Sequence, residues 1–176
     1  IGDLLYPLLL ESSNDAAEVI AEKYGRTSFL NEMNRTAEKI GMKDSYFVDP
    51  SGLNSLNIST ANDLFEEFRY LYKNHEEILN ITKKINYQIP KHRWVNISKL
   101  LKIDDYLGGK SGYTGEAGHT YMAMFSSLLS EFRDNKIVII ILDSENSTND
   151  TKNIFSYIQK NIYFAGNDMD VIMAEK

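Results

Sequence analysis

The sequence predicts an α+β fold in which a helical part packs on an antiparallel sheet. In the first half of the chain, apolar residues recur at spacings of three and four, the period of an amphipathic helix. In the second half, short runs rich in β-branched and aromatic residues replace that period. Asp134-Asn135 supplies a turn between the last two of these runs, which favours an antiparallel meander. Helices followed by strands are typical of the α+β class.

Local signals place the helices of the first half. Three apolar stripes precede residue 41, and Pro7 predicts a kink or a late start in the first of them. Gly25 and Gly41 are the expected C-terminal stops of the second and third helices. The segment Thr60 to Asp63 is a capping box that predicts the start of a fourth helix. A short fifth helix follows near residues 76–81.

The second half begins with an extended ribbon, because Ile85, Tyr87 and Ile89 alternate and Trp94 lies beyond Pro90. Three strands and a closing helix are then expected, over about 108–114, 120–127, 136–142 and 150–162. We expect a partial catalytic domain over 1–165, divided into a mostly helical part (1–84) and a part of strands plus closing helix (85–165), and then a tail (166–176).

The composition excludes several classes of function. The net charge is −6 with acids and lysines interspersed and no evident basic stripe, so we expect no nucleic-acid partner. Cysteine is absent and the three histidines are widely spaced, so we expect no metal and no cofactor. No apolar run reaches the ~18 residues of a membrane span. The chain begins at Ile1 with no signal peptide or anchor, which indicates a fragment or a processed piece.

A glycine-rich stretch between Leu107 and His119 is the strongest candidate for a binding site. It places Lys110 and Ser111 side by side on a predicted strand, next to Gly112. Such a strand offers a charge, a hydroxyl and bare backbone to an extended, anionic peptide that adds to the sheet edge. The ordinary alternative is an edge strand with a solvated lysine.

A second candidate lies near the amino end, where Ser12 and Asn14 occupy a polar junction between two predicted helices. Serine and asparagine are also common N-cap residues, so this pair alone is weak evidence for a site. The order of the motifs along the chain strengthens the case for a site, because Lys110-Ser111-Gly112 follows about a hundred residues later on a predicted strand.

The ordered set of motifs resembles the low-molecular-mass penicillin-binding proteins, the serine-type D-alanyl-D-alanine carboxypeptidases of the β-lactamase and transpeptidase-like superfamily. Each motif is short, but together they run in order over most of the chain, to about Leu142. The matching segments are Leu4-Leu5-Tyr6, Ser12 to Ala17, Met33-Asn34, Ile40-Gly41-Met42, Phe47 to Leu53, Ser59 to Leu64, Gly109 to Thr114 and Ala117-Gly118.

The resemblance implies an acyl-enzyme mechanism at a three-motif site. The catalytic residues it implies in this chain are Ser12, Asn14 and Lys110. Ser12 would relay a proton to the leaving amine, Asn14 would orient the base and the substrate amide, and Lys110 would shape the field. The substrate-binding residues it implies are Ser111, Gly112, Tyr113 and Thr114, with Ser111 holding the terminal carboxylate and the Tyr113 N–H as an oxyanion donor.

The chain departs from the family pattern in its nucleophile. The first motif of the family, Ser-x-x-Lys, occurs nowhere in the 176 residues. We expect it upstream of Ile1, together with the first strands of the sheet, so that this piece alone is inactive. The arginine that the family places near Ser147 is also missing, and Ser111 replaces a threonine.

The implied partners are peptidoglycan stem peptides, with β-lactam antibiotics as covalent inhibitors of the full protein. The implied location is extracytoplasmic, at the periplasm or cell surface, with the full-length protein associated with the membrane. One alternative is a non-catalytic relative that binds peptidoglycan peptides or serves as a scaffold. A class A β-lactamase is less favoured, because Glu76, its candidate for activating water, lies far from Ser12 in sequence and in a predicted helix.

Overall fold

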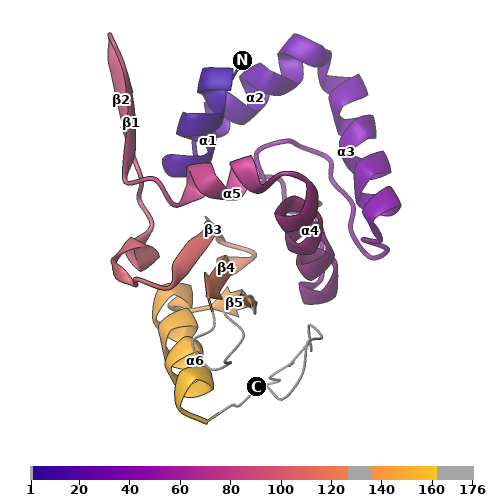
Figure 1. Ribbon diagram of the computed structural model, residues 1–176. Coiled ribbons are helices and arrows are strands. Elements are labelled where there is room, and N and C mark those ends of the chain that lie inside the picture. Colours follow the sequence, from indigo (N-terminus) through magenta and orange to yellow (C-terminus); the bar gives the residue numbers. More distant parts are fainter. Residues whose placement is uncertain (1, 127–135, 162–176) are drawn as a thin grey trace.

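The computed structural model describes residues 2–126 and 136–161 (Figure 1). Helices dominate the first half and strands the second, as the sequence predicts. The elements in order are η1 (Gly2–Leu4), α1 (Leu5–Leu10), α2 (Asn14–Tyr24), α3 (Arg26–Ile40), α4 (Ala61–Asn74), α5 (Glu76–Thr82), β1 (Asn86–Ile89), β2 (His92–Val95), η2 (Lys99–Lys102), β3 (Tyr106–Thr114), β4 (Gly118–Ser126), β5 (Lys136–Ser144) and α6 (Ser147–Asn161).

Local capping explains where the early helices begin and end. Pro7 lies in the first turn of α1, where its missing N–H removes no hydrogen bond within the helix, and a short 3₁₀ turn precedes it. Gly41 ends α3 in the left-handed conformation, with φ at 99°, which glycine adopts without a steric penalty. The Thr60 hydroxyl accepts from the Asp63 N–H at 3.2 Å and starts α4. The late start of α1 and these caps confirm the sequence predictions.

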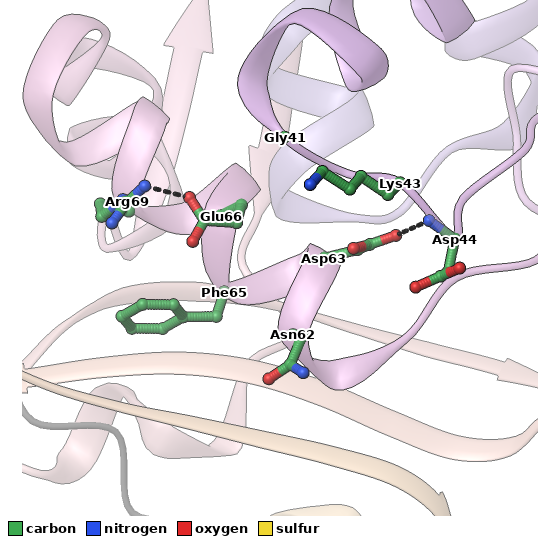
Figure 2. Close-up of a pocket in the computed structure, with 8 residues that line it drawn as sticks. All are labelled: Gly41, Lys43, Asp44, Asn62, Asp63, Phe65, Glu66 and Arg69. Carbon is green, nitrogen blue, oxygen red and sulfur yellow. Dashed lines mark hydrogen bonds and ion pairs between the residues drawn. The ribbon is translucent and has the colours of Figure 1, made fainter.

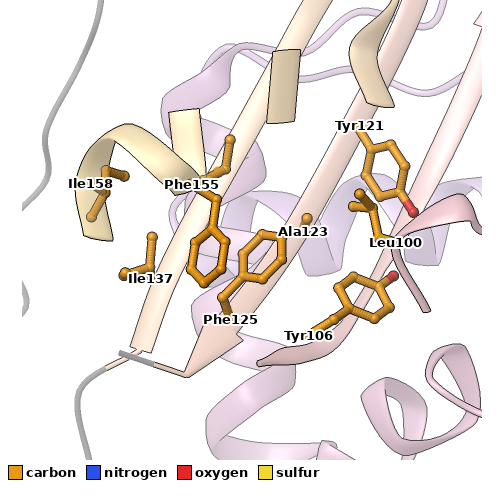
Figure 3. Close-up of a cluster of buried hydrophobic side chains, with 9 residues drawn as sticks. Leu100, Tyr106, Tyr121, Ala123, Phe125, Ile137, Phe155 and Ile158 are labelled. Atoms are coloured by element: carbon orange, nitrogen blue, oxygen red, sulfur yellow. The ribbon is translucent and has the colours of Figure 1, made fainter. Parts of the chain in front are cut away.

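The three long strands form one antiparallel sheet in the order β3-β4-β5. Alternate residues of β4 and β5 face α6 and η2 and form the main core (Figure 3). The rings of Phe125 and Phe155 stack there with centroids 4.1 Å apart. Removing a ring of this kind from a core costs about 3–5 kcal/mol. The buried members of this core are Leu100, Tyr106, Tyr121, Ala123, Phe125, Ile137, Ile139, Phe155 and Ile158.

The opposite face of the sheet packs against α4 and α5. Phe68 of α4, Leu79 of α5 and Met124 of β4 are buried together there. The sheet is therefore the middle of three layers, with α4 and α5 on one side and α6 on the other (Figure 1). This arrangement confirms the predicted fold class.

Two strands stand apart from the main sheet. Strands β1 and β2 form a two-stranded antiparallel ribbon, in which Tyr87 lies opposite Trp94. One side of this ribbon packs on α1, where the rings of Tyr6 and Tyr87 stack. The rest of it projects from the body of the molecule (Figure 1).

Some sequence predictions fall outside the described residues. The Asp134-Asn135 turn and the tail over 166–176 are among them, so these remain predictions. In the described ranges, each of the three long strands extends two residues further than expected at one end, and α6 begins at Ser147 rather than near residue 150. Within the same ranges, no helix has both the length and the apolar character to cross a membrane.

Candidate active site

The junction between α1 and α2 exposes two side chains because a third one performs the capping. Ser13 is the N-cap of α2, and its hydroxyl accepts from the Ala16 N–H at 3.2 Å. Ser12 and Asn14 flank Ser13, so neither is needed as the cap. Ser12 has φ at 58°, in the left-handed region that residues other than glycine rarely adopt. Such strain is found most often at functional positions.

Two glycines let strand β3 lie close to its neighbours, Gly108 to helix α5 and Gly109 to strand β4. Thr82, the last residue of α5, accepts through its hydroxyl from the Gly109 N–H at 3.0 Å and donates to the Leu79 carbonyl at 2.8 Å. A Cβ on Gly108 would lie 2.6 Å from the Thr82 Oγ1, and one on Gly109 would lie 2.1 Å from the Met122 carbonyl oxygen. Larger residues would force β3 away, so these glycines fix the strand immediately before Lys110.

The lysine of β3 meets the serine of the α1–α2 junction. Lys110 Nζ donates to Ser12 Oγ at 2.7 Å, across 98 positions of sequence, and to the carbonyl of Ser111 at 2.6 Å. Burial lowers the pKa of Lys110 to about 8, because the charged ammonium loses solvation. A lysine that titrates near pH 8 can both donate and accept a proton. With Ser12 it therefore forms a pair able to relay protons.

A groove of about 1160 Å³ connects the predicted site residues. All seven of them line it, namely Ser12, Asn14, Lys110, Ser111, Gly112, Tyr113 and Thr114. The α1–α2 junction and the second half of β3 form one part of its lining. The loop over residues 51–58 forms another, and it presents Leu53, which is 59% exposed. Polar groups for chemistry and an apolar side chain for contact thus share one elongated site.

Three of the predicted binding residues have defined neighbours. A Cβ on Gly112 would lie 2.9 Å from Thr120 Oγ1, so glycine here makes room for that hydroxyl as well as for a ligand. The Tyr113 ring is exposed and lies against His119, with centroids 4.4 Å apart. The Thr114 hydroxyl accepts from the Ala117 N–H at 3.1 Å and stabilises the turn into β4.

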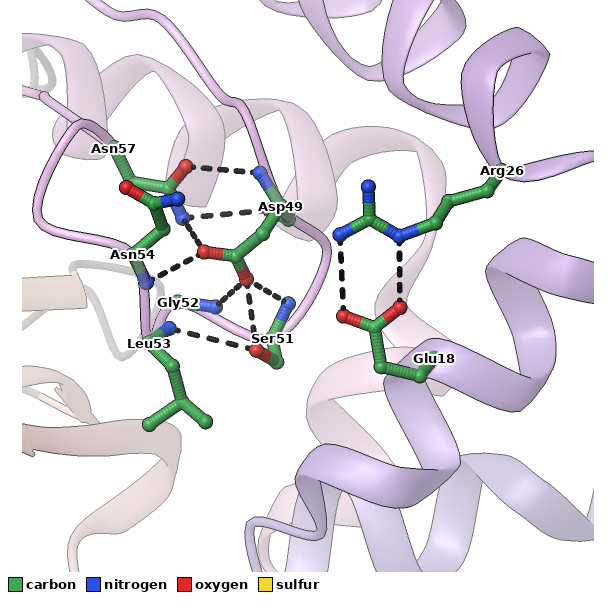
Figure 4. Close-up of polar contacts among 8 residues, drawn as sticks. All are labelled: Glu18, Arg26, Asp49, Ser51, Gly52, Leu53, Asn54 and Asn57. Carbon is green, nitrogen blue, oxygen red and sulfur yellow. Dashed lines mark hydrogen bonds and ion pairs between the residues drawn. The ribbon is translucent and has the colours of Figure 1, made fainter.

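The loop opposite β3 is held by one buried carboxylate (Figure 4). Asp49 accepts from the N–H groups of Ser51, Gly52 and Asn54 at 2.6–2.7 Å, and from the hydroxyl of Ser51 at 2.7 Å. The side chain of Asn57 adds a further bond at 3.1 Å. Burial alone would raise the pKa of Asp49, but these hydrogen bonds outweigh burial and hold the pKa below its ordinary value. The loop is therefore preorganised.

A second depression, of about 430 Å³, lies between the start of α4 and the end of α3 (Figure 2). It contains none of the predicted site residues. Two of its three carboxylates already have partners, since Asp63 accepts from the Asp44 N–H at 2.8 Å and Glu66 forms an ion pair with Arg69. We therefore assign the site to the larger groove. In the described part of the chain, no group of three or more His, Asp and Glu side chains gathers as metal ligands would.

Sequence reasoning missed two parts of the site. It did not assign the Asp49 loop a place in the groove, although Asp-x-Ser-Gly is a turn pattern in which the carboxylate accepts from the following backbone. It also missed Thr82, whose contact depends on how α5 packs. The adjacent pair Gly108-Gly109 was the available signal, because glycine inside a strand often marks a close backbone approach.

Comparison with known families decides where the chain belongs. The family model described as "D-alanyl-D-alanine carboxypeptidase", Peptidase_S11, matches residues 1–145. The chain belongs to this family. The serine-type carboxypeptidase resemblance and the penicillin-binding-protein fold inferred from the sequence are thereby confirmed.

Individual relatives agree with the family assignment. The chain is similar to a D-alanyl-D-alanine endopeptidase of Pseudomonas aeruginosa, with 33% identity over 66% of this chain and 41% of the relative. It is also similar to the D-alanyl-D-alanine carboxypeptidase DacF of Bacillus subtilis, with 30% identity over 70% of this chain and 34% of the relative. It thus spans less than half the length of these two relatives.

A similar solved structure supports the fold. Penicillin-binding protein D2 from Listeria monocytogenes, in its cefotaxime-bound form, matches with a TM-score of 0.77 and 33% identity. The match covers 88% of this chain and 64% of that one. The described helices and the β3-β4-β5 sheet therefore have the arrangement found in a β-lactam-binding protein.

Proposed function

We propose that the groove is part of a serine-type peptidase that hydrolyses the terminal D-Ala–D-Ala bond of peptidoglycan stem peptides. The observation that carries this proposal is the 2.7 Å hydrogen bond between Lys110 Nζ and Ser12 Oγ inside a groove that Asn14 also lines. The family assignment and the names of the relatives support the substrate class.

The proposed reaction proceeds through an acyl-enzyme. A serine of a Ser-x-x-Lys motif, which the 176 residues do not include, attacks the carbonyl between the two D-alanines and passes its proton to the lysine of that motif. The C–N bond then breaks and leaves an ester between the serine and the peptide. The leaving amine takes its proton through Ser12, which Lys110 holds by its hydrogen bond. Asn14 orients the lysine of that motif, which acts as the base, and the substrate amide. Water then hydrolyses the ester and regenerates the serine.

The second half of β3 is the proposed substrate strand. Lys110 supplies positive charge and Ser111 a hydroxyl for the terminal carboxylate of the peptide. The N–H of Tyr113 donates to the developing oxyanion, an interaction that commonly supplies the largest single part of acyl-transfer catalysis. Gly112 and Thr114 complete the edge along which the peptide extends.

The same geometry supports β-lactam binding. A β-lactam presents a strained amide beside a carboxylate, the two groups that the proposed site would recognise in a peptide. The likeness to penicillin-binding protein D2 in cefotaxime- and ampicillin-bound forms supports this extension. A substrate of the cell wall implies an extracytoplasmic location, which we include in the proposal.

Labelled penicillin tests the chemistry directly. We expect the full-length gene product to form a covalent adduct that survives denaturing electrophoresis, and excess unlabelled ampicillin to prevent it. Absence of an adduct in folded protein would refute the enzyme proposal. A stem pentapeptide and a cross-linked peptide dimer, followed by chromatography, separate carboxypeptidase from endopeptidase activity. The first releases free D-alanine, whereas the second yields two monomeric peptides.

A non-catalytic relative is the second candidate, because Ser-x-x-Lys is absent from the 176 residues. Such a protein would bind the stem peptide in the groove but form no adduct with penicillin. Calorimetry with the pentapeptide distinguishes it from a protein that has lost the site altogether. Binding without acylation would select this candidate, and binding with acylation would exclude it.

A further inference from the structure

One segment of the chain carries cations without acids, which corrects the expectation from the sequence that the two are interspersed throughout. Residues 83–102 contain six of the 19 Lys and Arg residues and none of the 25 Asp and Glu residues. The overall charge of −6 conceals this local excess. The six residues are all exposed, and they are Lys83, Lys84, Lys91, Arg93, Lys99 and Lys102.

The β1–β2 ribbon carries two of these cations, and two more lie at its base, between α5 and β1. Tyr87 pairs with Trp94 on one side of the ribbon, and their rings are nearly parallel, at 7°. Arg93 pairs with Gln88 on the opposite side, because side chains alternate along a strand. Lys91 lies in the turn that joins the strands, and Lys83 and Lys84 precede the first of them. The aromatic side packs on α1, and Glu11 also accepts from the Val95 N–H at 2.9 Å, while the side chains of the basic side stay exposed.

These cations have no carboxylate partners within the described residues. The three arginines of the helical part all form ion pairs, namely Arg26 with Glu18, Arg35 with Glu32 and Arg69 with Glu66. In contrast, none of the six cations of segment 83–102 is ion-paired with a carboxylate in the ranges 2–126 and 136–161. Their charge is therefore available to an external anionic surface.

Apolar side chains are interleaved with these charges. Ile85, next to Lys84, is 70% exposed, more than any other large apolar side chain of the described residues. Val95 is 46% exposed and lies two positions beyond Arg93, on the same side of the ribbon. A soluble polyanion would contact only the charges. A bilayer interface takes up both cations and aliphatic groups, which favours a lipid surface as the partner.

We propose that the basic side of the β1–β2 ribbon docks on a phospholipid bilayer rich in anionic headgroups. Lys83, Lys84, Lys91 and Arg93 contact the headgroup phosphates, Val95 enters the interface beside Arg93, and Ile85 lies next to Lys84 at the base of the ribbon. Each cation near such a surface strengthens binding roughly fivefold. The segment that follows the ribbon, residues 97–99, lines the groove, so docking would hold the groove close to the membrane. This surface does not depend on the chemistry proposed for the groove.

Vesicle cosedimentation of the whole chain tests the proposal. The vesicles are phosphatidylglycerol mixed with phosphatidylcholine, or phosphatidylcholine alone. The ribbon variant combines four substitutions, K83Q, K84Q, K91Q and R93Q. A matched control removes four exposed lysines elsewhere, on or beside α2, α3 and α4, by K23Q, K39Q, K43Q and K73Q. Both variants have the same net charge, so they differ only in where the charge is lost.

We expect the wild type and the control to bind the anionic vesicles and not the neutral ones, and the ribbon variant to bind at least about tenfold more weakly. Equal binding by the two quadruple variants would overturn the proposal. Circular dichroism checks that both are folded, as their exposed positions predict.

A second variant distinguishes a bilayer from a soluble polyanion. Combining I85S with V95S should weaken vesicle binding severalfold and leave the binding of inorganic polyphosphate unchanged. If this variant binds vesicles as well as the wild type, and polyphosphate competes at equal phosphate concentration, the surface recognises soluble polyanions instead. That result would overturn the assignment to a bilayer.

Discussion

Asp49 is a buried charge beside the groove and Lys110 a half-buried charge that lines it, and their surroundings differ in kind. The carboxylate of Asp49 accepts five hydrogen bonds from its own loop. The ammonium of Lys110 has partners for two of its three donors in the described residues, Ser12 and the Ser111 carbonyl. A fully satisfied charge stabilises one conformation, whereas an incompletely satisfied one retains capacity for a ligand. Asp49 therefore holds the loop in one conformation, whereas Lys110 keeps a donor for a ligand in the groove.

The pKa values of the two residues show the same contrast. Hydrogen bonds outweigh burial at Asp49 and hold its pKa low, so its charge is kept at all ordinary pH values. Burial dominates at Lys110 and lowers its pKa to about 8. The first residue is thus expected to affect mainly stability, and the second mainly reactivity. Each of the following experiments tests one side of this contrast.

The largest effect is expected from Lys110→Ala in the full-length gene product. Loss of the ammonium removes the partner of Ser12 and the charge that holds a carboxylate. We expect acylation by penicillin to slow by about tenfold to a thousandfold, by analogy with removal of one oxyanion donor. Stopped-flow measurement of acylation provides the rate. Lys43→Ala, in the separate depression near α4, is the control and should acylate at the wild-type rate.

The pH dependence of stability tests the lowered pKa of Lys110. Between pH 8 and 10.5 the unfolded lysine keeps its proton while the folded one loses it, so the free energy of unfolding rises with pH. Relative to Lys110→Met, which does not titrate, the wild type should gain at most about 3 kcal/mol over this range. Urea denaturation across the range measures the difference. A constant difference between the two proteins would contradict the lowered pKa.

Asp49→Asn should destabilise the fold without altering the chemistry of Lys110. An amide cannot accept the five bonds of the carboxylate, and we expect a loss of about 2 kcal/mol at pH 7 in urea denaturation. Because the folded pKa of Asp49 is lowered, the difference should shrink as the pH falls below about 4 and the native carboxylate is protonated. The exposed residue Asp44 offers a control, and Asp44→Asn should change stability little. A pH-independent loss would show that shape, not charge, is what the loop requires.

The smallest effect concerns the backbone of Ser12. Ser12→Gly and Ser12→Ala both remove the hydroxyl, but only glycine adopts a φ of 58° without penalty. We therefore expect the glycine variant to be more stable than the alanine variant by about 1 kcal/mol, measured by thermal denaturation. Equal stability would mean that the left-handed conformation imposes no strain.

Sequence reasoning succeeded where the deciding contacts are local or where motifs keep a fixed order. The Thr60 cap and the Gly41 stop depend on a few neighbouring residues, and both were predicted. The meeting of Ser12 and Lys110 is long-range, but the ordered motifs of a known family predicted that they share a cleft. The Asp49 network was not predicted as a wall of the groove, because its position there depends on packing of a whole loop against β3. The unpaired state of Arg93 was missed too, since ion pairing depends on which carboxylates come near it in space.

The hydrogen bond between Thr82 and Gly109 has a consequence for how this enzyme family can vary. Helix α5 ends on the strand backbone one residue before Lys110, so the position of the ammonium is set by a helix whose residues do not line the groove. A bulkier residue at position 82 would displace the strand and draw the lysine away from Ser12. In the proposed function, acylation by a β-lactam would therefore be slowed by a change in α5, with every groove residue unchanged.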